Sequence, residues 1–106
     1  DTIVAGVCET DFGGYPDCRQ PFIDAMQAAI NAAIEGAAPP IVIETPLMRL
    51  TKRETVLLAQ EVGALPALAL SHTCYNGARP PCGSCHACLL RRRGFEAAGI
   101  PDPLEG

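Results

Sequence analysis

The order of apolar and polar positions along the chain predicts two strands separated by a helix. Residues 3–7 form a nearly continuous apolar run rich in β-branched side chains, and residues 41–43 form a second such run. Runs of this kind are typical of strands buried on both faces of a parallel sheet. Between them, residues 20–35 carry apolar side chains at three- and four-residue steps, which predicts a helix with one face in the core. Together these elements predict one right-handed crossover unit.

Capping and breaking residues set the expected ends of the helices. Pro21 suits the first turn of this first helix, and Gly36 suits its end. Thr51 and Glu54 form a capping-box signature, so a second helix is expected to begin there. A last helix is expected over about residues 86–98.

The chain is expected to contain two regions. Residues 1–70 are predicted to be part of an α/β domain with a parallel sheet, including a buried connection or a brief helix over residues 64–70. Residues 71–106 are predicted to form a small helical zinc-binding region. Because two parallel strands do not make a stable sheet, the first strand is expected to lie beside strands from a segment outside these 106 residues.

Four cysteines crowd one short stretch of the chain, the run CYNGARPPCGSCHAC. The last three have C-x-x-C-x-x-C spacing, and Gly83 permits the tight turn that lets two thiolates converge. The first cysteine can complete a tetrahedron from across the loop. Four thiolates of this kind favour a closed zinc site, which leaves no position for water and stabilises the fold. The predicted ligands are Cys74, Cys82, Cys85 and Cys88.

Other interpretations of the cysteine run stay open at this point. Four cysteines also suit an iron–sulfur cluster, and His72 or His86 has a position from which it can replace one thiolate. Disulfides and buried free thiols are disfavoured, because no signal-peptide pattern is visible and free thiols do not cluster at ligand spacing. Outside the run, Cys8 is expected in the core, and Cys18 either packs or reacts.

The net charge of the chain limits the classes of molecule that it is expected to bind. The formal net charge is −4 and aromatic residues make up only 5%, which disfavours a nucleic-acid partner. Arginines nevertheless gather near the cysteines, at Arg79 and at residues 91–93. We expect some of these guanidinium groups to offset the thiolate charge. No apolar run is long enough to span a bilayer, so a soluble, reducing, cytoplasmic setting is expected.

A loop dense in polar groups, CETDFGGYPDCR, follows the first predicted strand. Open α/β sheets bind ligands at the carboxyl ends of their strands, so this loop is the first place to expect chemistry. Its Asp17 has an alternative role as the cap of the next helix.

Three segments in this order closely resemble the 7-cyano-7-deazaguanine synthase family, of the QueC type. They are the loop GVCETDFGGYPDCR, the strand-to-helix joint ETPLMRLTKRE, and the run CYNG followed by CGSCHAC. The resemblance extends from Ile3 to about Ala98, and the chain looks like the carboxyl-terminal half of such an enzyme.

The resemblance implies a fold and an activity. The fold is that of the N-type ATP pyrophosphatases, an adenine nucleotide alpha hydrolase-like domain. The activity is an ATP-dependent ligase of queuosine biosynthesis that converts 7-carboxy-7-deazaguanine and ammonia into the nitrile. ATP would bring Mg²⁺, the four cysteines would bind zinc, and a homodimer is expected. The family's phosphate-binding run SGGxDS does not occur in these residues, so the chain by itself is expected to be inactive.

The resemblance also implies that the loop after the first strand contributes to the substrate pocket. Lys52 is a weaker candidate for a phosphate contact. The alternative function is a structural zinc module that contacts RNA through the arginines or mediates oligomerisation. The predicted substrate-binding residues are Glu9, Asp11, Tyr15, Asp17 and Arg19.

Overall fold

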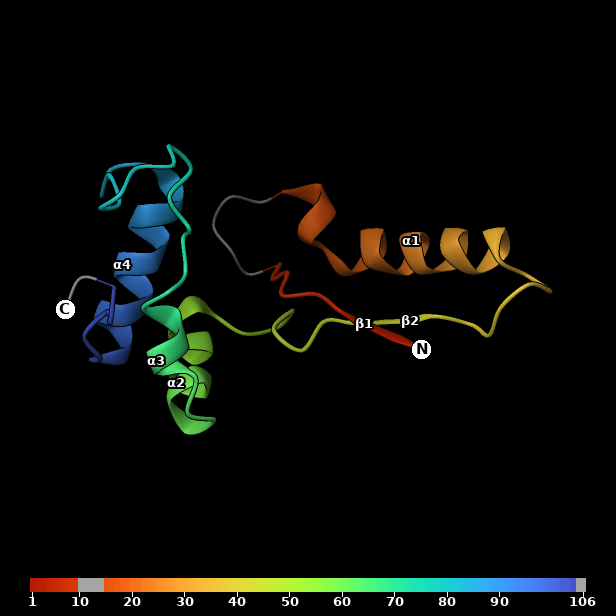
Figure 1. The fold of residues 1–106 in the computed structure, drawn as a ribbon, viewed down its shortest axis with the longest axis horizontal. Helices are drawn as coiled ribbons and strands as arrows, with labels where there is room; N and C mark the ends of the chain where they lie inside the picture. Colours follow the sequence, from red (N-terminus) through yellow and green to blue (C-terminus); the bar gives the residue numbers. More distant parts are fainter. Residues whose placement is uncertain (10–14, 105–106) are drawn as a thin grey trace. The chain divides into compact units, whose positions relative to one another are not determined.

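The computed structural model describes residues 1–9 and 15–104, which form two compact units (Figure 1). The first unit comprises residues 1–9 and 15–49, and the second comprises residues 50–104. The structure therefore mixes strands and helices, and its sheet is small and parallel, as the sequence predicts.

The first unit is the predicted strand–helix–strand crossover. Strand β1 (Thr2–Val4) leads through the short 3-10 helix η1 (Pro16–Cys18) and helix α1 (Gln20–Ala33) to strand β2 (Val42–Glu44). The strands pair in parallel, with Ile3 opposite Ile43. Strand β1 is shorter than the apolar run that predicted it, whereas β2 has the same length as its run and lies one residue later.

Side chains of α1 hold the outer edge of β2. The Asn31 amide accepts a hydrogen bond from the Ile41 N–H at 2.7 Å and donates one to the Ile41 carbonyl at 2.9 Å. The Gln27 carbonyl accepts a hydrogen bond from the Ile43 N–H at 2.7 Å. These backbone groups point away from β1. The β2 groups that hydrogen-bond toward the β1 side are the Val42 N–H and the Glu44 carbonyl. The helix therefore satisfies polar groups that another strand would otherwise pair with.

The prediction that both strand faces and the apolar helix face are buried is wrong for this structure. Ile3, Val4 and Val42 are 45%, 66% and 47% exposed, and Phe22 and Met26 on α1 are 38% and 39% exposed. A single helix covers only part of a two-stranded sheet, so apolar side chains remain in contact with solvent. The buried side chains of this unit are Cys8, Ile23 and Met48.

The second unit contains three helices. Helix α2 (Lys52–Glu61) begins with the predicted capping box, in which the Thr51 hydroxyl accepts the Glu54 N–H and the Glu54 carboxylate accepts the Thr51 N–H. Helix α3 (Leu65–Leu68) is one short turn, and helix α4 (His86–Ala98) follows the cysteine run. In the part of the chain that the structure describes, no helix combines the length and apolar character needed to cross a bilayer.

Helices α2 and α4 pack closely against each other (Figure 1). Gly94 makes this possible, because a Cβ atom there would lie 3.0 Å from the Lys52 Cβ and 3.4 Å from its carbonyl oxygen. Val56 and Phe95 are buried in the same unit. The observed division near residue 50 differs from the predicted boundary at residue 70, because α2 packs on the helix of the cysteine region.

Of the two alternatives predicted for residues 64–70, a buried connection or a brief helix, the structure has the brief helix α3. Leu65 and Leu68 are half-buried, and Leu70 is 87% exposed.

Replacing Gly94 with alanine should destabilise the second unit. Overpacking against a helix backbone costs about 1–3 kcal/mol, and the better helix propensity of alanine returns only about 1 kcal/mol. The measurement is chemical denaturation of the Gly94→Ala variant. Arg93→Ala, at the exposed preceding position, is the control and should change the free energy of unfolding by less than about 0.5 kcal/mol. Equal stability of Gly94→Ala and the parent protein would contradict the close packing.

Candidate metal centre

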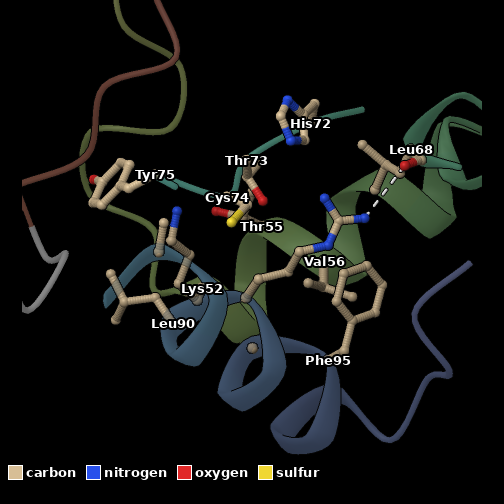
Figure 2. Close-up of a pocket in the computed structure, with 13 residues that line it drawn as sticks. Lys52, Thr55, Val56, Leu68, His72, Thr73, Cys74, Tyr75, Leu90 and Phe95 are labelled. Carbon is tan, nitrogen blue, oxygen red and sulfur yellow. Dashed lines mark hydrogen bonds between the residues drawn. The ribbon is translucent and has the colours of Figure 1, made fainter. Parts of the chain in front are cut away.

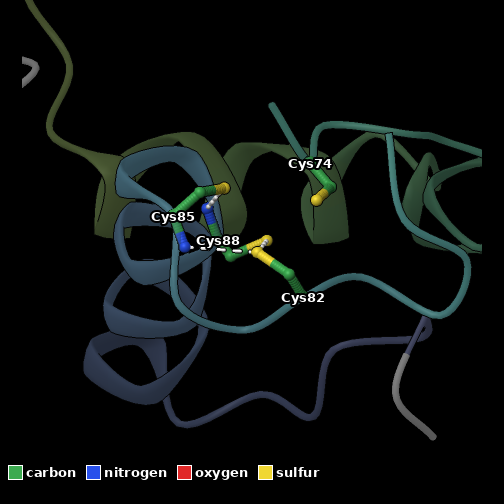
Figure 3. A group of neighbouring side chains, drawn as sticks. All are labelled: Cys74, Cys82, Cys85 and Cys88. Carbon is green, nitrogen blue, oxygen red and sulfur yellow. Dashed lines mark hydrogen bonds between the residues drawn. The ribbon is translucent and has the colours of Figure 1, made fainter. Parts of the chain in front are cut away.

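The four predicted cysteines converge in the second unit. The sulfur atoms of Cys74, Cys82, Cys85 and Cys88 all lie within 4.8 Å of one another (Figure 3). Four sulfurs at 2.3 Å from a tetrahedral zinc ion would lie about 3.8 Å apart. The cluster is therefore close to the size that a single metal ion requires, and four cysteine thiolates are suitable ligands for one.

A tight turn and a helix start place three of the sulfurs. Gly83 has a φ of +73°, which lets the chain fold back over Cys82. The N–H groups of Ser84 and Cys85 then point at the Cys82 sulfur, at 3.4 and 3.3 Å. Cys85 is the N-cap of α4, and its sulfur accepts the Cys88 N–H at 3.4 Å. These backbone dipoles favour negative charge on the sulfurs.

Cys74 arrives from the segment that follows α3 and is buried. The Gly77 N–H donates to the Cys74 carbonyl at 3.1 Å, which turns the chain directly after this cysteine. The side-chain amide of Asn76, inside that turn, donates to the Cys82 sulfur at 3.4 Å. The turn thus connects the distant ligand to the C-x-x-C turn.

The surroundings of Cys82 and Cys88 shift the pKa values of their thiols in opposite directions. Hydrogen bonds from the Ser84 N–H, then from the Ser84 hydroxyl and the Cys85 N–H, lower the pKa of Cys82 to about 5. At Cys88, a hydrogen bond from the Gly83 N–H favours the thiolate. Burial and the three neighbouring sulfurs outweigh it and raise the pKa of Cys88 to about 12. A bound cation would replace the proton that Cys88 retains.

The two nearby histidines lie outside the sulfur cluster. Among the described residues, the group with ligand geometry consists of the four cysteines alone. The His72 Nε2 atom lies 3.3 Å from the Ala78 carbonyl oxygen. The His86 Nε2 atom is buried without a hydrogen-bond partner. None of the six cysteines, all of which lie among the described residues, forms a disulfide, so the disulfide interpretation finds no support.

The arginines near the cluster divide between different roles. Some of the four arginines were expected to offset thiolate charge; among them, Arg91 pairs with Asp102 at 2.5 Å. The Arg92 guanidinium lies at the C-x-x-C turn, because its Nη2 atom is 3.0 Å from the position of a Cβ on Gly83. Arg79 and Arg93 are exposed. Arg92 is therefore the arginine placed beside the C-x-x-C turn, whereas Arg91 is engaged with Asp102.

A cavity of about 650 Å³ lies beside the metal centre in the same unit (Figure 2). Lys52 and Tyr75 lie at one end of it, and Leu68 and Phe95 at the other. Cys74 forms part of its wall, so the metal centre and the cavity share a structural element. Among the described residues that line the cavity, none carries a carboxylate. The lining residues are Lys52, Thr55, Val56, Leu68, His72, Thr73, Cys74, Tyr75, Ala87, Leu90, Arg91, Gly94 and Phe95.

The described members of the predicted substrate-binding set belong to the first unit. Tyr15 and Asp17 are exposed, at the start of η1 and within it, and Arg19 is exposed at the N-cap of α1. The Cys18 sulfur lies 4.0 Å from an Asp17 carboxylate oxygen. Asp11 lies outside the described residues. The described members of this set thus gather between β1 and α1, at the carboxyl end of a parallel strand.

Glu9 differs from the rest of this set because its groups are engaged within the protein. Its N–H donates to the Met48 carbonyl at 3.2 Å, and its carboxylate accepts the Gln20 N–H at 3.2 Å. The same carboxylate forms an ion pair with Arg49. Glu9, and not Asp17, therefore accepts a hydrogen bond at the start of α1. Arg49 was missed from sequence, because its partner is 40 positions away and no local pattern marks the pair.

Comparisons with known proteins match nearly the whole chain. The profile of the family described as "Queuosine biosynthesis protein QueC" matches residues 1–99. The 7-cyano-7-deazaguanine synthase of Gloeobacter violaceus is 60% identical over 105 residues, which cover 96% of this chain and 45% of that protein. The synthase of the same name from Laribacter hongkongensis is 57% identical over 102 residues, covering 96% and 43%.

A more distant relative agrees with these two. The 7-cyano-7-deazaguanine synthase of Burkholderia thailandensis is 46% identical over 106 residues, which cover 90% of this chain and 42% of that protein. The chain therefore spans less than half the length of the curated relatives it matches.

The unequal pKa values of the cysteines predict their order of alkylation. In metal-free, reduced protein at about pH 6.5, Cys82 is a thiolate and should react first with iodoacetamide, whereas Cys88 keeps its proton and should stay unmodified. Peptide mass spectrometry after brief labelling measures the order. Protein loaded with Zn²⁺ is the control and should be protected at all four positions. Labelling of Cys88 ahead of Cys82 would refute the assignment.

Proposed function

The chain belongs to the family of queuosine biosynthesis protein QueC, and we propose that it forms the carboxyl-terminal half of an ATP-dependent 7-cyano-7-deazaguanine synthase. The family predicted from three sequence motifs is thereby confirmed. The observation that carries the proposed activity is the match to synthases of that name, at 46–60% identity, across the loop, the strand-to-helix joint and the cysteine run.

The proposed reaction turns a carboxylate into a nitrile. The carboxylate of 7-carboxy-7-deazaguanine is a poor electrophile, so its oxygen attacks the α-phosphorus of ATP and releases pyrophosphate. Ammonia then displaces AMP from the acyl adenylate, loses a proton and leaves an amide. The amide oxygen then attacks the α-phosphorus of a second ATP and releases a second pyrophosphate. Loss of AMP and of the two N–H protons gives the nitrile. Such chemistry depends mainly on positioned groups and on stabilisation of phosphate charge.

The metal in this proposal is zinc with a structural role. Four thiolates complete a tetrahedron and leave no position for water or substrate. The backbone N–H groups directed at Cys82 and Cys85 support the fit, because they stabilise the thiolate form that zinc requires. When bound, the ion would hold the Cys74 segment to the start of α4, and with it one wall of the cavity.

The loop between β1 and α1 is the proposed contact with the deazaguanine acid. Asp17 would accept hydrogen bonds from the amidine edge of the base, and Arg19 would meet a carboxylate or a phosphate. Tyr15 is exposed and has a ring that can stack on a flat base. Asp11 stays in the proposed set on its sequence position. Glu9 is better assigned to holding the loop, because its carboxylate already has two partners.

The cavity of the second unit is a proposed site for an anionic group of ATP or of the acid. It combines an apolar lining with the Lys52 ammonium and the Thr55 hydroxyl, and its size suits a small ligand. The phosphate-binding run SGGxDS does not occur in these 106 residues. We therefore assign ATP phosphates and Mg²⁺ chiefly to the rest of the enzyme, whose fold we propose to be adenine nucleotide alpha hydrolase-like. The homodimer, the cytoplasmic setting and the inactivity of this chain by itself stay predictions.

RNA binding, the alternative interpretation of the arginines, is less well supported. Arg91 is committed to a buried pair with Asp102 and is not available to a phosphate backbone. Its side chain is only 13% exposed.

Loss of one thiolate should abolish metal binding. We expect the parent protein to contain one zinc ion per chain and Cys82→Ser to contain little, because a hydroxyl is a poor zinc ligand. Metal analysis measures the zinc content, and thermal unfolding measures the stability that is lost with the ion. Cys18→Ser, which lies outside the cluster, is the control and should keep its zinc. A folded parent protein with no zinc would sink the proposed metal role.

In a full-length synthase that carries this chain, Asp17→Ala and Arg19→Ala should raise the KM for 7-carboxy-7-deazaguanine roughly tenfold or more. The reason is the loss of a charge-assisted hydrogen bond to the substrate. Steady-state kinetics of nitrile formation measure KM and kcat separately. Glu35→Ala, an exposed position just after α1, serves as the control. Parent-like KM in both variants would remove these side chains from the pocket.

A further inference from the structure

One buried guanidinium joins three segments of the second unit. The Nε and Nη2 atoms of Arg91 donate to the two oxygens of Asp102 at 2.5 and 2.8 Å. Its Nη1 atom donates to the Ser71 hydroxyl at 2.7 Å, and Nη2 also lies 3.3 Å from the Leu68 carbonyl. Asp102 further accepts the Leu104 N–H at 2.9 Å. We call this group the Arg91 clasp.

The clasp connects the segments that carry the cysteines. Arg91 follows Cys88 by three residues on α4, so both lie within one helical turn. Ser71 precedes Cys74 by three residues. A bond between Arg91 and Ser71 therefore fixes the distance between the segment of Cys74 and the helix of Cys88.

The clasp is rigid for three reasons. The Arg91 and Asp102 side chains are only 13% and 4% exposed, so water competes weakly for their hydrogen bonds. The guanidinium meets the carboxylate through two parallel bonds, a geometry that fixes orientation as well as distance. The Phe95 ring also lies under the guanidinium, with its centroid 5.5 Å from the Arg91 Cζ atom.

We propose that Arg91, oriented by Asp102, is a positioning residue of the metal centre, which holds Cys74 near the other three cysteines before the ion binds. A site whose ligands already converge loses less conformational freedom on binding the ion. Groups that orient metal ligands typically change metal affinity roughly 10- to 100-fold when they are removed. The proposal rests on the proposed zinc centre and is independent of the nitrile-forming reaction.

A competing explanation is that Arg91 only stabilises the fold. A double variant distinguishes a role in positioning the ligands from a role in stability alone. Replacing a buried ion pair by apolar side chains of similar size is often neutral for stability or favourable. Arg91→Met combined with Asp102→Leu should therefore restore the free energy of unfolding. It cannot restore the bonds to Ser71 and Leu68.

The experiment compares the purified parent protein with Arg91→Met, Arg91→Lys and the Arg91→Met/Asp102→Leu pair. Competition with a chromogenic chelator measures the Zn²⁺ dissociation constant, and the absorption spectrum of the Co²⁺ form reports tetrahedral thiolate geometry. We expect roughly 10- to 100-fold weaker zinc binding in all three variants. Arg91→Lys keeps the charge but not the bidentate bond, so it should not restore the zinc affinity of the parent protein. Arg93→Met removes an exposed arginine from the same helix and should bind zinc like the parent protein.

Each outcome decides the proposal. Reduced zinc affinity in a double variant with restored stability supports a positioning role. Zinc affinity within twofold of the parent protein in the double variant, or equal weakening by Arg93→Met, overturns it. A parent protein that binds no Zn²⁺ refutes the metal centre itself, which is a different result from a parent that binds Zn²⁺ without needing Arg91.

Discussion

The second unit depends on the electrostatic cost of bringing four cysteine sulfurs together. Four thiolates this close would repel one another strongly, and four neutral thiols would leave polarised backbone N–H groups facing weak acceptors. A cation held by the four sulfurs would offset both effects. The start of α4, the turn at Gly83 and the turn after Cys74 are all arranged around that centre. The cavity inherits its wall from the same arrangement, because Cys74 belongs to both.

Local features of the structure follow closely from the sequence. The capping box at Thr51 and Glu54, the C-x-x-C turn and the parallel pairing of β1 with β2 each depend on residues whose spacing is visible in the chain. The same holds for the start of α4 at Cys85. Short-range geometry leaves few alternatives at such positions, so the candidate metal ligands could be identified before the fold was known.

Long-range partners could not be predicted in this way. Some of the arginines near the cysteines were expected to offset the thiolate charge, yet Arg91 pairs with Asp102 from beyond the end of α4. A helix cap was one of the two roles considered for Asp17, yet it is the Glu9 carboxylate that accepts the Gln20 N–H at the start of α1. Burial was misjudged for a related reason. An apolar run indicates that both faces of a strand are suited to burial. Whether they are buried depends on the elements that pack against the strand.

The amide side chains of Gln27 and Asn31 also determine how the sheet can grow. Because they occupy the outward-facing backbone groups of β2, a foreign strand arriving at that side would first have to displace three hydrogen bonds. The strand–helix–strand unit can therefore extend a larger sheet through β1, whereas β2 is suited to be an edge strand of that sheet. A chain with so much exposed β-branched surface carries, at this edge, its own protection against open-ended polymerisation.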